Sequence, residues 1–265
     1  MQDKRLLAFP IMSGIVSVIV MATFLLPLFF PEVIAGTGME SGVLFLIGML
    51  FVLYVVCYVI VIFFNTALVA CVNARLNNYQ MSIMGALLVA LRHIFPILGW
   101  ALISATVGVL LQILEDRAGF VGQIGAILIG GLWWMVTFFV VPIFVLEDKG
   151  VFDAMKDSFA LIKKTWGESI IGAASITIVF VLIGLAVLLL TAAVSYIADP
   201  VIIGVVYILV LIFMIVLGVV ASTLQGIFVT AAYTFAKTGN VPPAFERDLI
   251  ASAFLPKSGQ TQDNI

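Results

Sequence analysis

The single histidine of the chain, His93, is the first residue to test for catalysis, because an imidazole exchanges protons near neutral pH. Hydrolysis by a serine nucleophile would require His93 to meet a serine, such as Ser82 or Ser158, and a carboxylate. No nucleophile-elbow pattern marks either serine. The sequence therefore predicts no catalytic residue and a protein that is not an enzyme.

Metal binding has little support in the residue types present. One histidine excludes a multi-histidine site, and Cys57 and Cys71 lie roughly 21 Å apart along one predicted helix, too far to pair or to share a metal. The neighbouring carboxylates Glu115 and Asp116 could gather calcium or magnesium, although an acidic loop that lacks lysine explains them more simply. We predict no metal and no cofactor. With a formal net charge of −2 and no basic block, we also predict no nucleic-acid partner.

The elements that position these residues are predicted to be helices inside a membrane. Hydrophobic residues make up 64% of the chain and charged residues 10%, whereas soluble domains are about half apolar and about a quarter charged. Charged residues divide the chain into six apolar runs, each long enough for a helix of about 20 residues to cross a bilayer. The prediction is an all-α polytopic membrane protein, with one domain over residues 1–254 and a polar tail over 255–265. Its six transmembrane helices are predicted at about 9–31, 43–72, 96–114, 119–146, 169–197 and 201–235, with kinks at Pro27 and Pro142.

Few polar side chains lie inside these spans. None of them is ionisable, which argues against ion-coupled transport, because such carriers usually need a buried charge. Asn65 and Gln225 are the most notable amides. Each could line a route for a small molecule or orient a headgroup; the alternative is a hydrogen bond between helices, worth about 0.6–2 kcal/mol.

Lysine and arginine predict the orientation, since they are concentrated in loops on the cytoplasmic side of a membrane. Of the 12 lysines and arginines, only Arg117 falls on the opposite side. We therefore predict a multi-pass protein of a prokaryotic cytoplasmic (inner) membrane, with both termini in the cytoplasm. His93, at the predicted cytoplasmic edge beside Arg92, is most simply a residue of the headgroup region, with catalysis or pH sensing as the alternative.

A charged segment, residues 151–166, lies between the fourth and fifth spans. Its apolar residues recur at spacings of three and four and form one helical stripe, with charged residues on the other face. The segment is too short and too charged to cross a membrane, so we predict an amphipathic helix at the cytoplasmic interface, with aromatic rings in the acyl boundary. The residues predicted to meet lipid or a partner are Phe152, Met155, Phe159, Lys163, Lys164 and Trp166.

A second segment, residues 82–94 between the second and third spans, follows a polar turn in the same way and could be capped by Ser82. The economical interpretation is a tandem repeat of span, span and surface helix, with a third candidate copy after Pro243 in the C-terminal tail. The stripe of this second amphipathic helix is predicted to consist of Ile83, Leu87, Ala90, Leu91 and Ile94.

Several stretches, among them "FNTALVACVNARL", "TFFVVPIFVLEDKG" and "AKTGNVPPAFERDLIASAF", resemble an uncharacterised prokaryotic family of six-helix integral membrane proteins. The resemblance covers roughly residues 3–254. More distantly, the layout is similar to that of YciC-like and glycerophosphodiesterase-membrane-domain proteins, in which amphipathic segments also interrupt helix pairs. The resemblance implies a fold and a location, and it implies no catalytic residue.

The leading functional expectation is a non-enzymatic membrane protein that engages lipid headgroups or a partner protein through its cytoplasmic amphipathic helices. Membrane lipids are the expected partners, with a protein partner or a second copy of the chain beside them. The alternative is a transporter or channel for an apolar or amphipathic small molecule, with Asn65 and Gln225 along its route. A lipid-modifying enzyme is a third option, which would need Ser82, His93 and a carboxylate within hydrogen-bond reach.

Overall fold

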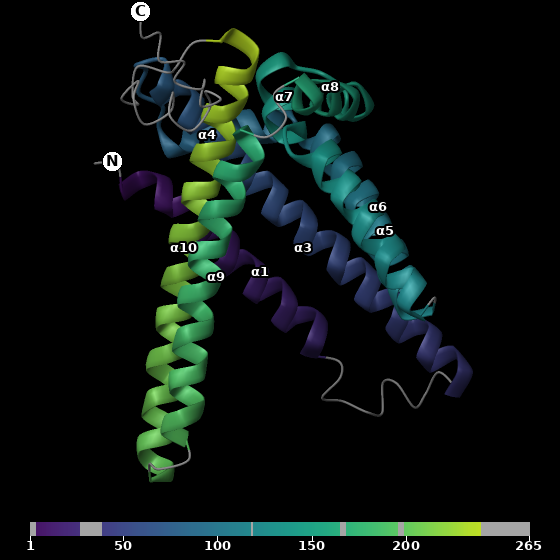
Figure 1. The fold of residues 1–265 in the computed structure, drawn as a ribbon, viewed down its shortest axis with the longest axis vertical. Coiled ribbons are helices and arrows are strands. Elements are labelled where there is room, and N and C mark those ends of the chain that lie inside the picture. The colour runs from purple at the N-terminus through teal and green to yellow at the C-terminus, as the bar shows by residue number, and fades with distance from the viewer. Residues whose placement is uncertain (1–3, 27–38, 118, 165–167, 196–198, 240–265) are drawn as a thin grey trace, which may run out of the picture. The chain divides into compact units, whose positions relative to one another are not determined.

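The structure, a computed structural model, describes residues 4–26, 39–117, 119–164, 168–195 and 199–239 (Figure 1). Every regular element in these residues is a helix, and six helical segments are long and apolar enough to cross a membrane. This confirms the predicted all-α, polytopic class. The elements are the 3-10 helix η1 (Lys4–Leu7), then α1 (Ala8–Leu25), α3 (Met39–Leu76), α4 (Ile83–Arg92), α5 (Ile94–Arg117), α6 (Gly119–Thr137), α7 (Val140–Glu147), α8 (Val151–Lys164), α9 (Glu168–Ser195) and α10 (Pro200–Thr238).

The chain divides into two compact units. The first takes Met1–Val72 and Met81–Phe159, and the second takes Asn73–Gln80 and Ala160–Ile265. Within the first unit, α5 and α6 run side by side as a hairpin; within the second, α9 and α10 do the same (Figure 1). Both hairpins follow from long apolar runs joined by connections that are only a few residues long.

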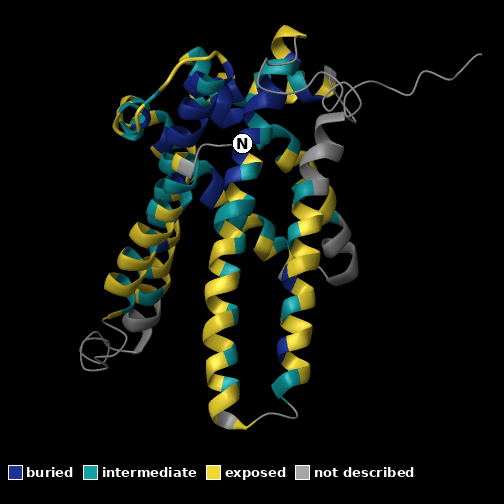
Figure 2. Cartoon of the chain, turned by 90° about the vertical axis from the view of Figure 1, so that its left-hand side faces the viewer, coloured by how far each residue is buried: buried dark blue, intermediate teal, exposed yellow. Residues whose placement is uncertain are grey.

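Two of the spans are longer than a membrane requires. Helix α3 has 38 residues and α10 has 39, so each is about 57 Å long, against a hydrocarbon core of about 30 Å. Each carries a basic residue in its last turn, Arg75 or Lys237, where the helix dipole favours a cation. The long apolar surface of α10 is largely exposed, as a lipid-facing helix requires (Figure 2).

The fourth span is broken, with α6 and α7 separated at Phe138 and Phe139. Pro142 explains part of this break, because proline has no N–H to donate to the carbonyl of Phe138, four residues earlier. The backbone of Phe139, with φ −105° and ψ 6°, lies outside the helical region. Helix α7 beyond the break is buried from Val140 to Val145 (Figure 2). Pro27, the other predicted kink, lies outside the described residues.

Left-handed residues follow three of the spans. Among the described residues, the positive φ angles belong to Asn78 (61°), Asp148 (55°) and Gly239 (69°). Asp148 and Gly239 come directly after α7 and α10, and Asn78 comes two residues after the end of α3. These helices end the second, fourth and sixth spans. Asparagine, aspartate and glycine are the residue types that tolerate this conformation best, and it commonly ends a helix. A left-handed residue therefore follows the second span of each pair within two residues, which supports the tandem repeat.

Candidate functional site

The candidate site is the short helix α8, whose rotation is set by a face of small side chains. Ala154 and Ser158 are 0% exposed and Ile162 is 2% exposed, and these three residues recur every four positions. We call them the buried face of α8. At the start of the helix, Val151 packs near Gly99 of α5, where a Cβ on the glycine would lie 3.6 Å from Val151 Cγ2.

Ser158 binds the broken fourth span. Its hydroxyl oxygen accepts a hydrogen bond from the backbone N–H of Phe139, with an N–O distance of 3.0 Å, and its O–H donates to the carbonyl oxygen of Met135 at 3.4 Å. In a continuous helix the Phe139 N–H would donate directly to that Met135 carbonyl. The Ser158 hydroxyl therefore stands inside the hydrogen-bond ladder of the span and satisfies both groups that the break leaves open.

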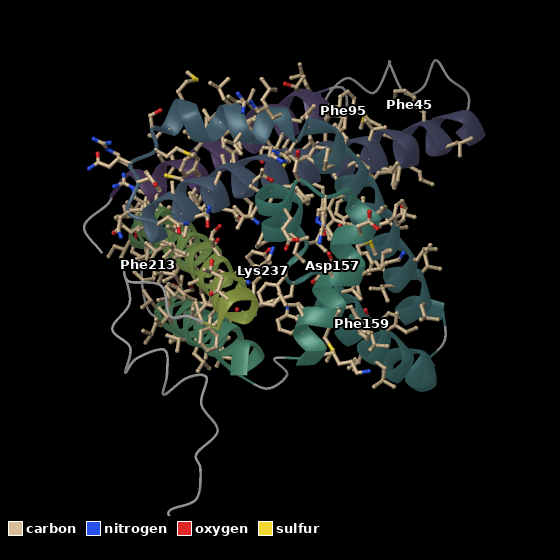
Figure 3. The ribbon with its side chains drawn as sticks, turned by 90° about the horizontal axis from the view of Figure 1, so that it is seen from above. Phe45, Phe95, Asp157, Phe159, Phe213 and Lys237 are labelled. Atoms are coloured by element: carbon tan, nitrogen blue, oxygen red, sulfur yellow. The ribbon has the colours of Figure 1, made fainter. Side chains whose placement is uncertain are left out.

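The opposite side of α8 carries an exposed stripe in which aromatic and basic residues alternate. Phe152 is 71% exposed and Phe159 is 42% exposed, and Lys156 and Lys163 are also exposed. Because their spacings are four, three and four, these four side chains follow one line along the helix. We call Phe152, Lys156, Phe159 and Lys163 the outer stripe. Asp157 lies two residues before Phe159, which corresponds to about 160° around the helix, so its carboxylate is on another flank of α8. Figure 3 labels both residues.

A third lysine, at the entrance to α8, is used inside the protein. Lys149 Nζ lies 2.5 Å from Asp157 Oδ2 and 2.7 Å from Glu147 Oε2, so it joins the end of α7 to the middle of α8. The hydrogen bond with Asp157 and then the one with Glu147 raise the pKa of Lys149 above its ordinary value of 10.5. Lys149 therefore stays charged throughout the physiological range, and two carboxylates neutralise that charge.

Helix α4 repeats this arrangement. We aligned residues 83–95 with residues 151–163, so that Ile83 corresponds to Val151. The two residues of each aligned pair are then equally buried, half-buried or exposed, except at the pairs Gly85/Asp153 and Ile94/Ile162. Ala86 and Ala90, both 0% exposed, correspond to Ala154 and Ser158. The exposed residues that correspond to the outer stripe are Met84, Leu88 and Leu91, followed by Phe95 at the start of α5 (Figure 3).

His93 joins the two repeats within the first unit. Its Nδ1–H donates to the carbonyl oxygen of Val89 at 2.8 Å, and its Nε2 lies 3.2 Å from Asp148 Oδ1. Both neighbours are hydrogen-bond acceptors. The serines that the sequence offered as nucleophiles have other hydrogen bonds: Ser82 accepts from the Gly85 N–H as a helix cap, and Ser158 binds span four. Among the described contacts, His93 meets a carboxylate and neither serine.

The remaining predicted site residues divide as follows. Met155 is half-buried between the two faces of α8, whereas the side chain of Lys164 and the whole of Trp166 lie outside the described residues. Asn65 on α3 and Gln225 on α10 are exposed and belong to different units. The structure thus groups Phe152, Phe159 and Lys163 along one exposed line and adds Lys156 to them. The pattern had placed both lysines on the face opposite the aromatic residues. The small residues at spacing four, Ala154 and Ser158, were the signal that could have located the buried face.

Comparison with known proteins gives a family. The family of unknown function DUF6159 matches residues 43–242, about three quarters of the chain. The chain belongs to this family. The DUF6159 match includes both short helices, α4 and α8, and the five spans from α3 to α10. No curated protein and no solved structure matches the chain.

Proposed function

We propose that this protein is a non-enzymatic, multi-pass protein of a prokaryotic cytoplasmic membrane that engages lipid headgroups through α8 and α4, as a membrane-organising or assembly subunit. The observation that carries the proposal is the outer stripe of α8. A helix that buries Ala154, Ser158 and Ile162 cannot rotate to hide Phe152 and Phe159, so these rings stay available to the membrane.

The energetics favour a membrane boundary around these rings. Burial of a phenylalanine side chain stabilises by about 1.5–3 kcal/mol, whereas a lysine ammonium group must remain near water or phosphate. A helix in which phenylalanine and lysine side chains alternate along one exposed line is most stable where the acyl chains meet the headgroups. The corresponding exposed residues of α4 and α5, Met84, Leu88, Leu91 and Phe95, are all apolar, so this surface is most stable slightly deeper in the same boundary.

The proposed orientation places α8 on the cytoplasmic side, with both termini in the cytoplasm. It rests on the basic residues, which are concentrated on the cytoplasmic side of membrane proteins. Within the first unit, the contact between His93 and Asp148 brings the end of α4 to the end of α7. Arg92 and Lys149, the neighbours of these two residues, therefore lie on one side of the membrane, in agreement with the proposal.

Two other functions remain as alternatives. A partner protein or a second copy of the chain could cover the same outer stripe. Transport of an apolar or amphipathic small molecule would use Asn65 and Gln225, whose side chains are exposed on α3 and α10. The distant similarity to YciC-like and glycerophosphodiesterase-membrane-domain proteins stays a prediction, and it adds no activity to the proposal.

The test is the double variant Phe152→Ser/Phe159→Ser, compared with the wild type by native mass spectrometry after gentle extraction. We expect the variant to hold tightly bound phospholipid at least about tenfold more weakly, because two anchoring rings are lost. The matched control is Phe45→Ser/Phe213→Ser, since these phenylalanines are 48% and 43% exposed but lie in α3 and α10 (Figure 3). Equal lipid retention in both variants, or loss of a bound protein instead of lipid, would refute the proposal.

A further inference from the structure

We infer that the outer stripe of α8 selects anionic phospholipids, with Lys156 and Lys163 binding their phosphates. The inference rests on the proposed function and specifies its ligand. Lipid engagement by the rings alone would treat all headgroups alike, because acyl chains are the same beneath a neutral and an anionic headgroup. The lysines between the rings are what could distinguish the headgroups.

The charge of these two lysines is available to a ligand. Lys149 is neutralised by Glu147 and Asp157, whereas Lys156 and Lys163 make no ion pair with any residue that the structure describes. The carboxylate of Asp157 is thereby occupied. Among the described residues, Asp153 makes no ion pair with Lys156, which lies three residues later. The outer stripe therefore presents two unneutralised positive charges and no negative one, which complements an anionic surface.

The spacing of the stripe suits separate headgroups. Lys156 and Lys163 are two turns apart, which corresponds to about 10 Å along the helix axis. Phe152 and Phe159 alternate with them, so each ammonium group stands beside a ring that can enter the acyl boundary. The rings hold the helix at the depth of the phosphates, and the lysines then meet phosphate oxygens by extension of their flexible stems.

Helix α4 isolates the role of the lysines. At the positions that correspond to Lys156 and Lys163 it has Leu88 and Phe95, which are exposed in the same way but carry no charge. The two helices bury small side chains at the same positions, Ala86 and Ala90 in α4 and Ala154 and Ser158 in α8. The two repeats thus differ in the chemistry of the exposed stripe, and we assign the selection of anionic lipid to the second repeat only.

The test uses the full-length protein in mixed micelles with photoreactive phosphatidylglycerol and phosphatidylcholine in equal amounts. Crosslinks on α8 and on α4 are then located by peptide mass spectrometry. A lysine near an anionic surface favours it about fivefold, so the wild type should show a preference of up to about 25-fold for phosphatidylglycerol on α8 and none on α4. The variant Lys156→Gln/Lys163→Gln should bring the two lipids to near parity on α8. The control Lys4→Gln/Lys237→Gln removes the same number of charges outside α8 and should leave the preference unchanged.

The outcomes distinguish this inference from the proposed function on which it rests. If the Lys156→Gln/Lys163→Gln variant keeps the wild-type preference, or if the wild type has none, selection of anionic lipid by this stripe is wrong. The proposed function survives that result as long as Phe152→Ser/Phe159→Ser still lowers crosslinking to both lipids. If the aromatic variant crosslinks both lipids like the wild type, the proposed function fails, and this inference fails with it.

Discussion

Replacement of Ser158 by alanine is expected to lower the free energy of unfolding by about 1–3 kcal/mol, because the buried N–H of Phe139 loses its acceptor. The Met135 carbonyl loses a donor in the same step. Urea or thermal unfolding in detergent measures the effect. Hydrogen exchange at the Phe139 amide should also become faster in the variant, since the hydroxyl that protects it is gone.

Thr106→Ala is the matched control for the Ser158 prediction. The Thr106 hydroxyl donates to the carbonyl of Leu102 in its own helix and is exposed, so its loss should cost less than about 0.5 kcal/mol. Equal effects of the two substitutions would show that the hydroxyl inserted in span four contributes no more than an ordinary surface hydroxyl. Unchanged exchange at Phe139 would point to the same conclusion.

Ala154→Leu is expected to destabilise the protein by about 1–3 kcal/mol and to displace α8, because Ala154 is 0% exposed and the added side chain has no space. Thermal unfolding measures the first effect, and the rate of proteolysis within α8 measures the second. The control is Ala160→Leu, which adds the same atoms to an exposed position of the same helix. That substitution should be nearly neutral. If Ala160→Leu is the more damaging of the two, the assigned rotation of α8 is incorrect.

The membrane class was predictable because apolar length is a property of each segment alone. Six uncharged runs predict six spans whatever their mutual arrangement. The rotation of α8 was only partly predictable, since the hydrophobic stripe placed Phe152, Phe159 and Ile162 on one face, whereas the structure buries Ile162 and exposes the two rings. Small residues such as Ala154 give a weak hydrophobic signal, although their size is what lets the helix pack closely.

The role of Ser158 could not be predicted from the sequence. Its partners, Phe139 and Met135, lie 19 and 23 residues earlier in another helix. Pro142 indicated that span four would bend, but no local pattern links a serine in α8 to that bend. The repeat was detectable only in outline for a related reason. Its two copies share the degree of burial at most positions, and many different side chains can satisfy that requirement.

The most direct test of the account is the depth and sidedness of α8 in sealed native membrane vesicles. Single cysteines at Phe152, Lys156, Phe159 and Lys163 would be introduced after Cys57 and Cys71 are replaced by alanine. We expect an impermeant maleimide to label the two lysine positions from the cytoplasmic side only. Fluorophores at the two phenylalanine positions should be quenched by brominated acyl chains. Labelling of position 163 only from the opposite side, or quenching at position 159 by an aqueous quencher alone, would contradict the account.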